Sequence, residues 1–235
     1  MKRAAALGIA VSLSAAAALA QSDPLGLGLP EPAAREEGDP VRGQAIALGG
    51  PFEDLGRVSC AQCHGIDGTG DDSGAFPRLA GQGAFYLYEA LNDFATGARP
   101  NEVMSPIAAQ LSDTDRRDVA AYFAAIEDAA YPAPRDANAD LLQRGGALAA
   151  IGGIGGDVPA CDSCHGAQGA GVPPVYPTLG GQHEAYLVQQ LELFRSGERG
   201  SDALGVMRAI AALLSDDDIA AVAAYYASVR PEPSP

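Results

Sequence analysis

The chain has 235 residues, of which 47% are hydrophobic, 19% charged and 6% aromatic, and its formal net charge is −15. The apolar content excludes a disordered polymer, and one apolar run of near-spanning length excludes a polytopic membrane protein. The acidic balance excludes nucleic-acid binding, because a nucleic-acid interface is basic. The rare residues are more informative: four Cys, three His, three Met and no Trp.

The first 20 residues are organised like a secretory signal peptide. A short basic start, Met1-Lys2-Arg3, precedes an Ala-rich apolar stretch, and Ala18-Leu19-Ala20 offers an A-x-A cleavage site. We expect cleavage near Ala20 to release a periplasmic protein that has no lysine; an uncleaved membrane anchor is the alternative. Residues 21–40, with four Pro, predict a flexible acidic leader.

Two copies of one unit make up the remainder of the chain. The segment C-A-Q-C-H-G at residues 60–65 recurs as C-D-S-C-H-G at residues 161–166, and F-P-R-L-A-G-Q at 76–82 recurs as Y-P-T-L-G-G-Q at 176–182. Such an internal repeat indicates a tandem duplication. We place the two domains at residues 41–130 and 140–230, with a linker at 131–139 and a tail at 231–235.

Each unit is predicted to be all-α, with three helices, loops and no convincing strand. In the first unit, Asp39-Pro40 starts a helix that ends near Leu48, a second helix covers residues 84–96, and Ser112 caps a third. The counterparts cover about residues 140–150, residues 183–196 and a helix capped by Ser215. The last helix of each unit carries an apolar stripe that predicts core packing, with an exposed interaction face as the alternative. The stripe residues are Val119, Tyr122, Phe123 and Ile126, then Ile219, Val222, Tyr225, Tyr226 and Val229.

All four cysteines lie in two C-x-x-C-H motifs, a pattern typical of covalent c-type haem attachment. Two thiols one helical turn apart can form thioethers with the two vinyl groups of a haem, and the next residue, a His, can then bind the iron. The residues are Cys60, Cys63 and His64, then Cys161, Cys164 and His165. Structural disulfides would leave the repeated His unexplained, a zinc site would need further ligands, and a thioredoxin-like pair would need a β-α-β setting. The sequence therefore predicts two covalently bound haem c groups.

The sixth iron ligands are predicted to be Met104 and Met207. Outside the initiator they are the only methionines, and they follow the haem histidines by 40 and 42 residues. A lone Met is usually core filler, but two at equivalent positions of a repeat indicate a shared role. His183 aligns with Gly83, so we expect a surface residue at a helix start rather than a ligand.

These motifs carry a family resemblance. C-x-x-C-H-G, a Pro-x-Leu further on, a late Met and a C-terminal amphipathic helix resemble class I cytochrome c. The duplication, with Gly-Gln before a Tyr-Leu helix, is similar to the dihaem cytochrome c4 group over about residues 41–230. The resemblance implies two class I domains, each wrapped around one haem, in which the Pro77 and Pro177 carbonyls accept the ring N–H of the haem-binding histidine. Simple turn formation is the alternative role for both prolines.

Several features depart from the family pattern. Gly-rich segments at residues 49–59 and 152–160 precede the attachment motifs, and V-P-A at 158–160 is similar to cytochrome subunits of periplasmic dehydrogenases. Without Trp, the haem propionates lack a common donor. Two matched pairs of side chains could replace it: Tyr86 with Tyr186, and Arg99 with Arg199. The alternative for both Arg is a place on a solvated face. The acidic loop 67–72 is not a calcium site of EF-hand spacing, and its second copy lacks the acids.

Iron that is coordinated by both a His and a Met has no open position for a substrate, which favours outer-sphere transfer of single electrons over catalysis. We therefore expect a periplasmic carrier between respiratory complexes, for example from a quinol–cytochrome c reductase to a terminal oxidase. Its partners are redox proteins, with no nucleic acid and no small-molecule substrate. The alternative is the electron-transfer subunit of a periplasmic dehydrogenase complex; a dihaem peroxidase would need one accessible iron.

Overall fold

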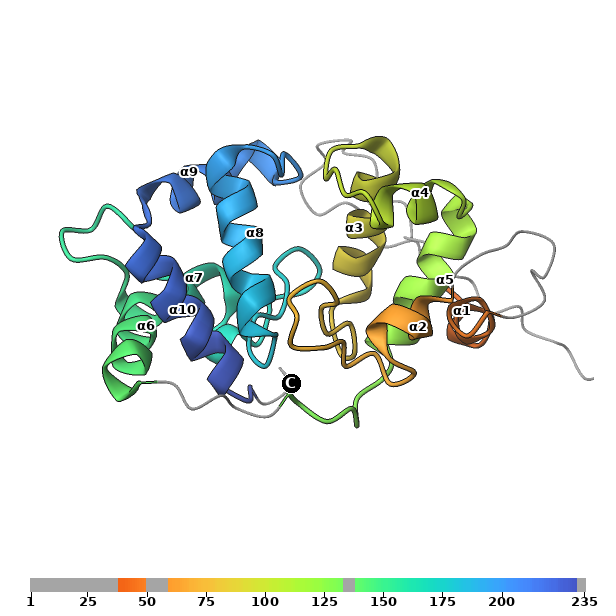
Figure 1. The fold of residues 1–235 in the computed structure, drawn as a ribbon, viewed down its shortest axis with the longest axis horizontal. Coiled ribbons are helices and arrows are strands. Elements are labelled where there is room, and N and C mark those ends of the chain that lie inside the picture. Colours follow the sequence, from red (N-terminus) through yellow and green to blue (C-terminus); the bar gives the residue numbers. More distant parts are fainter. Residues whose placement is uncertain (1–37, 50–58, 133–137, 232–235) are drawn as a thin grey trace, which may run out of the picture. The chain divides into compact units, whose positions relative to one another are not determined.

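The computed structural model, drawn in Figure 1, describes residues 38–49, 59–132 and 138–231. The predicted signal peptide, most of the leader, part of the linker and nearly all of the tail lie outside the described residues. Among the described residues, no helix has the length and apolar composition that crossing a bilayer requires.

Both halves contain the same succession of helices. The first half has α1 (Pro40–Ala47), α2 (Cys60–His64), α3 (Ala84–Thr96), α4 (Met104–Ala109) and α5 (Asp113–Ala124). The second has α6 (Ala139–Ile151), α7 (Asp162–His165), α8 (Glu184–Ser196), α9 (Val206–Leu213) and α10 (Asp216–Ser228), with short 3₁₀ turns at Ala167–Gly169 and Ala203–Gly205. Across the described part of the chain, extended pairing is limited to an isolated bridge between Val172 and Tyr176. The all-α prediction is confirmed.

The helices begin and end at the capping residues that the sequence predicts. Asp39 accepts hydrogen bonds from the N–H groups of Val41 and Arg42 at the start of α1. Ser112 and Ser215 each form a capping box with the acid three residues later, which starts α5 and α10. Left-handed glycines end α3 and α8, with φ of 82° at Gly97 and 81° at Gly197.

The expectation of three helices per unit was wrong, because α2 with α4, and α7 with α9, are additional. Helix α4 has six residues, too few for a helical period to show in the sequence. Its start is marked instead by Asn101, whose side-chain oxygen accepts from the N–H groups of Val103 and Met104. In the second half Asp202 accepts from the N–H of Arg208 within α9. An Asx residue a few positions before each Met was therefore the sequence signal that could have predicted the starts of α4 and α9.

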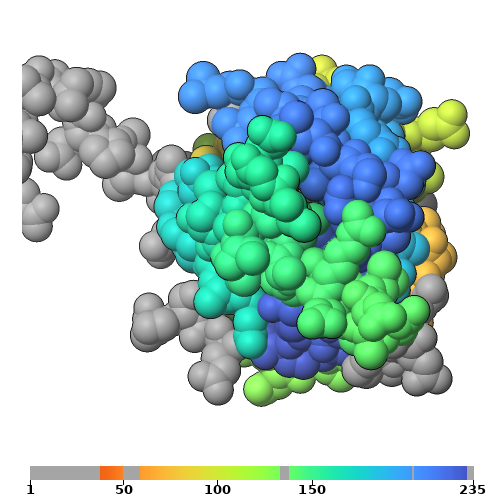
Figure 2. Space-filling model, turned by 90° about the vertical axis from the view of Figure 1, so that its left-hand side faces the viewer, coloured from red at the N-terminus to blue at the C-terminus, as the bar shows by residue number. Residues whose placement is uncertain are grey.

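Each half is built around a close crossing of its first and last helices, α1 with α5 and α6 with α10. Glycine makes the approach possible: a Cβ at Gly43 would lie 1.9 Å from the Asp118 carbonyl oxygen, and one at Gly145 would lie 2.0 Å from that of Ala221. Figure 2 shows α6, in green, lying against the blue α10. The crossings bury the predicted stripes, and Phe123 and Ile219 are each 2% exposed. The core interpretation of the stripes is confirmed.

Candidate functional site

Each of the two C-x-x-C-H motifs occupies a short helix. Cys60, Cys63 and His64 lie on α2, while Cys161 caps α7 and Cys164 and His165 lie on it. All four cysteines are free of disulfides. Burial raises the pKa of Cys60 and raises that of Cys161 to about 11, so both remain thiols at neutral pH. A protonated thiol does not suit the thioredoxin-like alternative, which needs a thiolate.

The motif histidines are buried, and one ring nitrogen of each is already engaged. His64 is 6% exposed and His165 is 8% exposed. Nδ1 of His64 donates to the Pro77 carbonyl oxygen at 3.0 Å, and Nδ1 of His165 donates to that of Pro177 at 2.9 Å. A carbonyl can only accept, so Nδ1 carries the proton and Nε2 keeps its lone pair. Burial also lowers the pKa of both rings, which keeps them neutral. Each histidine is thus prepared to bind a metal through Nε2.

The loop after each motif brings the proline carbonyl to the ring. Gly70 donates its N–H to the His64 carbonyl at 2.8 Å, and Gly171 does the same for His165 at 2.7 Å. Both glycines have positive φ, and a Cβ at Gly70 would lie 2.1 Å from the Phe76 carbonyl oxygen. Only glycine tolerates this turn, which places Pro77 opposite His64. In each half, the C-x-x-C-H motif and the Pro-x-Leu that follows it are therefore held together by this glycine turn.

The two methionines take equivalent places in the fold. Met104 is the first residue of α4 and Met207 is the second residue of α9. Both side chains are half-buried. The helices that carry them follow α3 and α8 through the left-handed glycines, so each half presents one methionine after its second long helix.

Arg99 and Arg199 are buried, which excludes the solvated-face alternative for them. Each is 6% exposed, and their side chains reach across from one half to the other. Arg99 donates to the Tyr186 hydroxyl at 2.7 Å and to Gln190 Oε1 at 2.5 Å. Arg199 donates to the same Gln190 oxygen at 2.9 Å and to the Tyr86 hydroxyl at 3.3 Å. These side-chain acceptors are neutral.

Two buried cations held by neutral acceptors favour an anion nearby. Burial raises the pKa of Asp93, the carboxyl group whose charge acts on both cations. Burial also opposes ionisation of Tyr86, but the guanidinium groups of Arg199 and Arg99 outweigh it and lower the Tyr86 pKa to about 8. Two buried guanidinium groups therefore lie beside a carboxyl group that burial makes harder to ionise. Free Cys pairs, available Nε2 atoms and this cationic cluster together fit a haem in each half.

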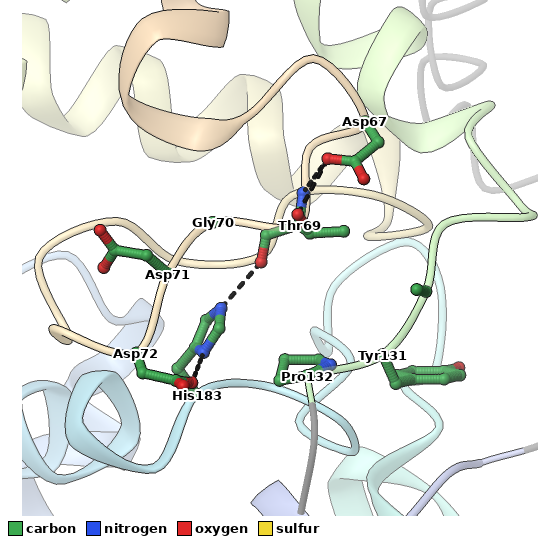
Figure 3. Close-up of a pocket in the computed structure, with 9 residues that line it drawn as sticks. Asp67, Thr69, Gly70, Asp71, Asp72, Tyr131, Pro132 and His183 are labelled. Atoms are coloured by element: carbon green, nitrogen blue, oxygen red, sulfur yellow. Dashed lines mark hydrogen bonds and ion pairs between the residues drawn. The ribbon is translucent and has the colours of Figure 1, made fainter.

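His183 is not the surface residue that the sequence predicted. It caps α8 as expected, but it is 5% exposed. Its Nδ1 lies 2.9 Å from Asp72 Oδ1 and its Nε2 lies 2.7 Å from the Thr69 carbonyl oxygen (Figure 3). The loop that receives it belongs to the other half, a contact that no local pattern could show. Both ring nitrogens face oxygen acceptors, in keeping with the prediction that His183 is not an iron ligand.

The acidic loop 67–72 lines the pocket beside His183 (Figure 3). Asp67 accepts from the Thr69 hydroxyl at 2.8 Å, and Asp71 accepts from the Ser73 hydroxyl and from the N–H of Ser73, the latter at 2.9 Å. These bonds lower the pKa of both carboxyl groups. The acids shape their own loop and receive His183.

Comparison with known proteins agrees with this geometry. The cytochrome c family pattern matches twice, at residues 52–127 and 158–230. A cytochrome c4 from Pseudomonas aeruginosa is 39% identical over 82% of this chain and 89% of its own length. This chain belongs to the cytochrome c4 family. The predicted fold, a tandem of two class I cytochrome c domains, and its two covalent haem c groups are confirmed.

Two further relatives bear on function. A thiosulfate dehydrogenase electron acceptor from Stutzerimonas stutzeri is 42% identical over 73% of this chain and 79% of its own length. The crystal structure of reduced cytochrome c4 from Pseudomonas stutzeri superposes with a TM-score of 0.69 at 34% identity, covering 82% of this chain and all of that one. The chain is accordingly a dihaem electron-transfer protein whose partners are redox proteins, and it is not an enzyme.

Proposed function

We propose that Cys60 and Cys63 hold one haem through thioether bonds, that Cys161 and Cys164 hold the other, and that His64 and His165 bind the two irons through Nε2. The observation that carries the proposal is the buried histidine of each motif, whose Nδ1 is held by a proline carbonyl. The carbonyls of Pro77 and Pro177 orient the rings and increase their basicity.

Met104 and Met207 complete the coordination in this proposal. The haem supplies one-electron chemistry when it is bound. A thioether sulfur raises the reduction potential and leaves no position for a substrate. Residues 41–130 and 140–230 form the two haem domains, joined by 131–139.

We further propose that residues 1–20 direct export, that cleavage near Ala20 removes them, and that the protein works in the periplasm. It carries single electrons between respiratory complexes, for example from a quinol–cytochrome c reductase to a terminal oxidase. The similarity to cytochrome c4 proteins over most of the chain supports this assignment.

The second candidate is an electron-transfer partner or subunit of a periplasmic dehydrogenase complex. Its support is the 42% identity to a thiosulfate dehydrogenase electron acceptor. The two candidates differ in the protein that donates electrons to this chain. Reduction of the purified protein should be followed with a quinol–cytochrome c reductase and, separately, with a thiosulfate dehydrogenase supplied with thiosulfate. Faster reduction by the reductase supports the respiratory carrier, and the reverse supports the second candidate.

The haem attachment is tested by replacing Cys161 and Cys164 with Ser. The variant should lose half of the haem that resists acid–acetone extraction, because only the second motif is removed. Ser163→Ala is the matched control, since Ser163 lies between the two cysteines and donates to the Ala160 carbonyl. Full retention of covalent haem in the double variant would contradict the assignment.

A further inference from the structure

Two buried glutamines connect the halves of the molecule reciprocally. Gln82 and Gln182 occupy equivalent positions of the repeat, and each is 7% exposed. Gln82 Oε1 accepts from the N–H of Thr178 and its Nε2 donates to the Thr178 carbonyl, both at 2.9 Å. Gln182 makes the same pair of bonds with the backbone of Arg78, also at 2.9 Å. Each side-chain amide is thus paired with one residue of the opposite half.

The peptide groups that these glutamines hold are the ones that hold the motif histidines. The N–H of Thr178 and the carbonyl of Pro177 belong to a single peptide group, and that carbonyl accepts from His165 Nδ1 at 2.9 Å. In the other half, the N–H of Arg78 and the carbonyl of Pro77 form one peptide group, which accepts from His64 Nδ1 at 3.0 Å. A continuous chain of hydrogen bonds therefore joins each histidine to a glutamine of the opposite half.

The orientation of both amides is fixed by their partners. A backbone N–H only donates and a backbone carbonyl only accepts, so Oε1 must face the N–H and Nε2 must face the carbonyl. A second donor strengthens this assignment, because Gln82 Oε1 also accepts from the N–H of Gly83 at 2.9 Å and Gln182 Oε1 from that of His183 at 3.0 Å. Both glutamines are the positioned ends of a hydrogen-bond chain.

We propose that Gln82 is a positioning residue for His165 and that Gln182 is a positioning residue for His64. The inference rests on the proposed role of the two histidines as iron ligands. A hydrogen bond accepted from the peptide N–H polarises that peptide and makes its carbonyl a stronger acceptor. The stronger acceptor draws the Nδ1 proton and makes the histidine a more basic ligand. A more basic ligand favours ferric iron, so each glutamine lowers the reduction potential of the haem in the other half.

This arrangement ties haem potential to contact between the halves. Any event that loosens the contact removes both glutamines at once, and both potentials rise. A local tuning residue would act on its own haem, whereas these residues act across the interface. The crossed pattern is therefore the property to measure.

The test replaces each glutamine by leucine in the full haem-loaded protein. Two quantities are measured: the potential of each haem, resolved by NMR during a redox titration, and the chemical shift of each histidine Nδ1 proton in the ferrous state. Gln82→Leu should raise the potential of the second haem more than that of the first and move the His165 Nδ1 proton to lower frequency. Gln182→Leu should do the same for the first haem and His64. Gln44→Leu, at an exposed position on α1, is the control and should change neither.

Gln82→Glu separates polarisation from a general loss of contact. It keeps an oxygen for the Thr178 N–H while losing the donor, so the potential of the second haem should not rise. Equal shifts at both haems in every variant, a larger shift at the haem of the mutated half, or no shift at all would overturn the proposal. If the wild-type ferrous protein lacked the resonances of an iron-bound histidine, the ligand assignment itself would fail instead.

Discussion

At the residue scale, a buried histidine is useful as a ligand only when its protonation state is fixed. Burial lowers the pKa of His64 and His165, and the proline carbonyl directs the remaining proton to Nδ1. The result is a neutral ring with Nε2 available at neutral pH. In the proposed coordination the methionine completes the iron, and it is therefore the residue on which carrier and enzyme differ.

Met104→Ala should open the first haem alone. Its ferrous form should bind CO, its ferric form should lose the Met–iron charge-transfer absorption, and its potential should fall because the sulfur ligand is gone. CO titration and spectroelectrochemistry measure these changes. Met207→Ala should mirror them at the second haem, because the two cores are separate. An unchanged first haem in Met104→Ala would show that another group closes it.

At the element scale, each half depends on a helix crossing that glycine permits. Backbone oxygens occupy the position of a Cβ at Gly43 and Gly145. Next to the first crossing, Arg42 of α1 forms ion pairs with Asp115 and Asp118 of α5, whose side chains are 9% and 4% exposed. The matching Arg144 of α6 meets Asp217 and Asp218, which are 85% and 26% exposed. The carboxylates of these ion pairs are therefore buried at the first crossing and more exposed at the second.

Gly43→Ala should destabilise the protein by about 3 kcal/mol, since overpacking against rigid backbone costs this much. Gly146→Ala is the control: its Cβ would meet only the Tyr225 ring, at 3.2 Å, and alanine gains up to about 1 kcal/mol of helix propensity. Urea unfolding of the haem-loaded proteins measures both. Equal effects at the two positions would show that the close crossing does not limit stability.

Arg42→Leu should cost about 2 kcal/mol, because it leaves two largely buried carboxylates without their cationic partner. Arg144→Leu should cost under about 1 kcal/mol, as expected for an exposed pair. Urea unfolding at neutral pH compares them. Equal losses would indicate that burial of the carboxylates does not decide the value of the pair.

Acid should weaken the α1–α5 crossing. Burial opposes ionisation of Asp115, but hydrogen bonds from Ser112 and the Arg42 guanidinium outweigh it and lower the Asp115 pKa. A carboxyl group with a lowered pKa contributes its full stability above about pH 4, the unfolded-state pKa, and loses it as the pH falls through the folded-state value. Asp115→Asn should therefore lose less stability than wild type below about pH 4, measured as urea midpoints. An identical loss of stability in acid would show that Asp115 does not cause the acid sensitivity of the crossing.

At the scale of the whole molecule, the feature that bears on partners is charge. The net charge of the chain is −15, and neither half is basic. Contact between the halves uses neutral hydrogen bonds and buried Arg, and one acid, Asp72, meets His183 there. The other acids of the surface remain for docking. A basic patch around the electron-transfer site of the partner would complement it.

Electron transfer with the physiological partner should slow as ionic strength rises. Screening removes the steering of a basic partner, and the bimolecular rate should fall by about tenfold between ~10 mM and ~0.5 M salt. Stopped-flow mixing over a salt series measures it. A rate that rises with salt would leave the acidic surface with a role in solubility alone.

The sequence predicts what is local or repeated. The helices capped by Asp39, Ser112 and Ser215 follow from residues close together in the chain. The pairing of each Cys-His motif with a Pro-x-Leu follows from the resemblance to class I cytochrome c. The pattern was too short to show α4. Burial of His183 and the reciprocal bonds of Gln82 depend on residues of the other half, about a hundred positions away, so no local rule could find them.

The most direct test of the central claim, that both irons are closed and the protein only carries electrons, is CO titration of the ferrous wild-type protein. With His64 and Met104 on one iron and His165 and Met207 on the other, the account predicts no significant uptake of CO at either haem. Uptake of one equivalent per chain would contradict it, because an open iron would then be available for catalysis or ligand sensing.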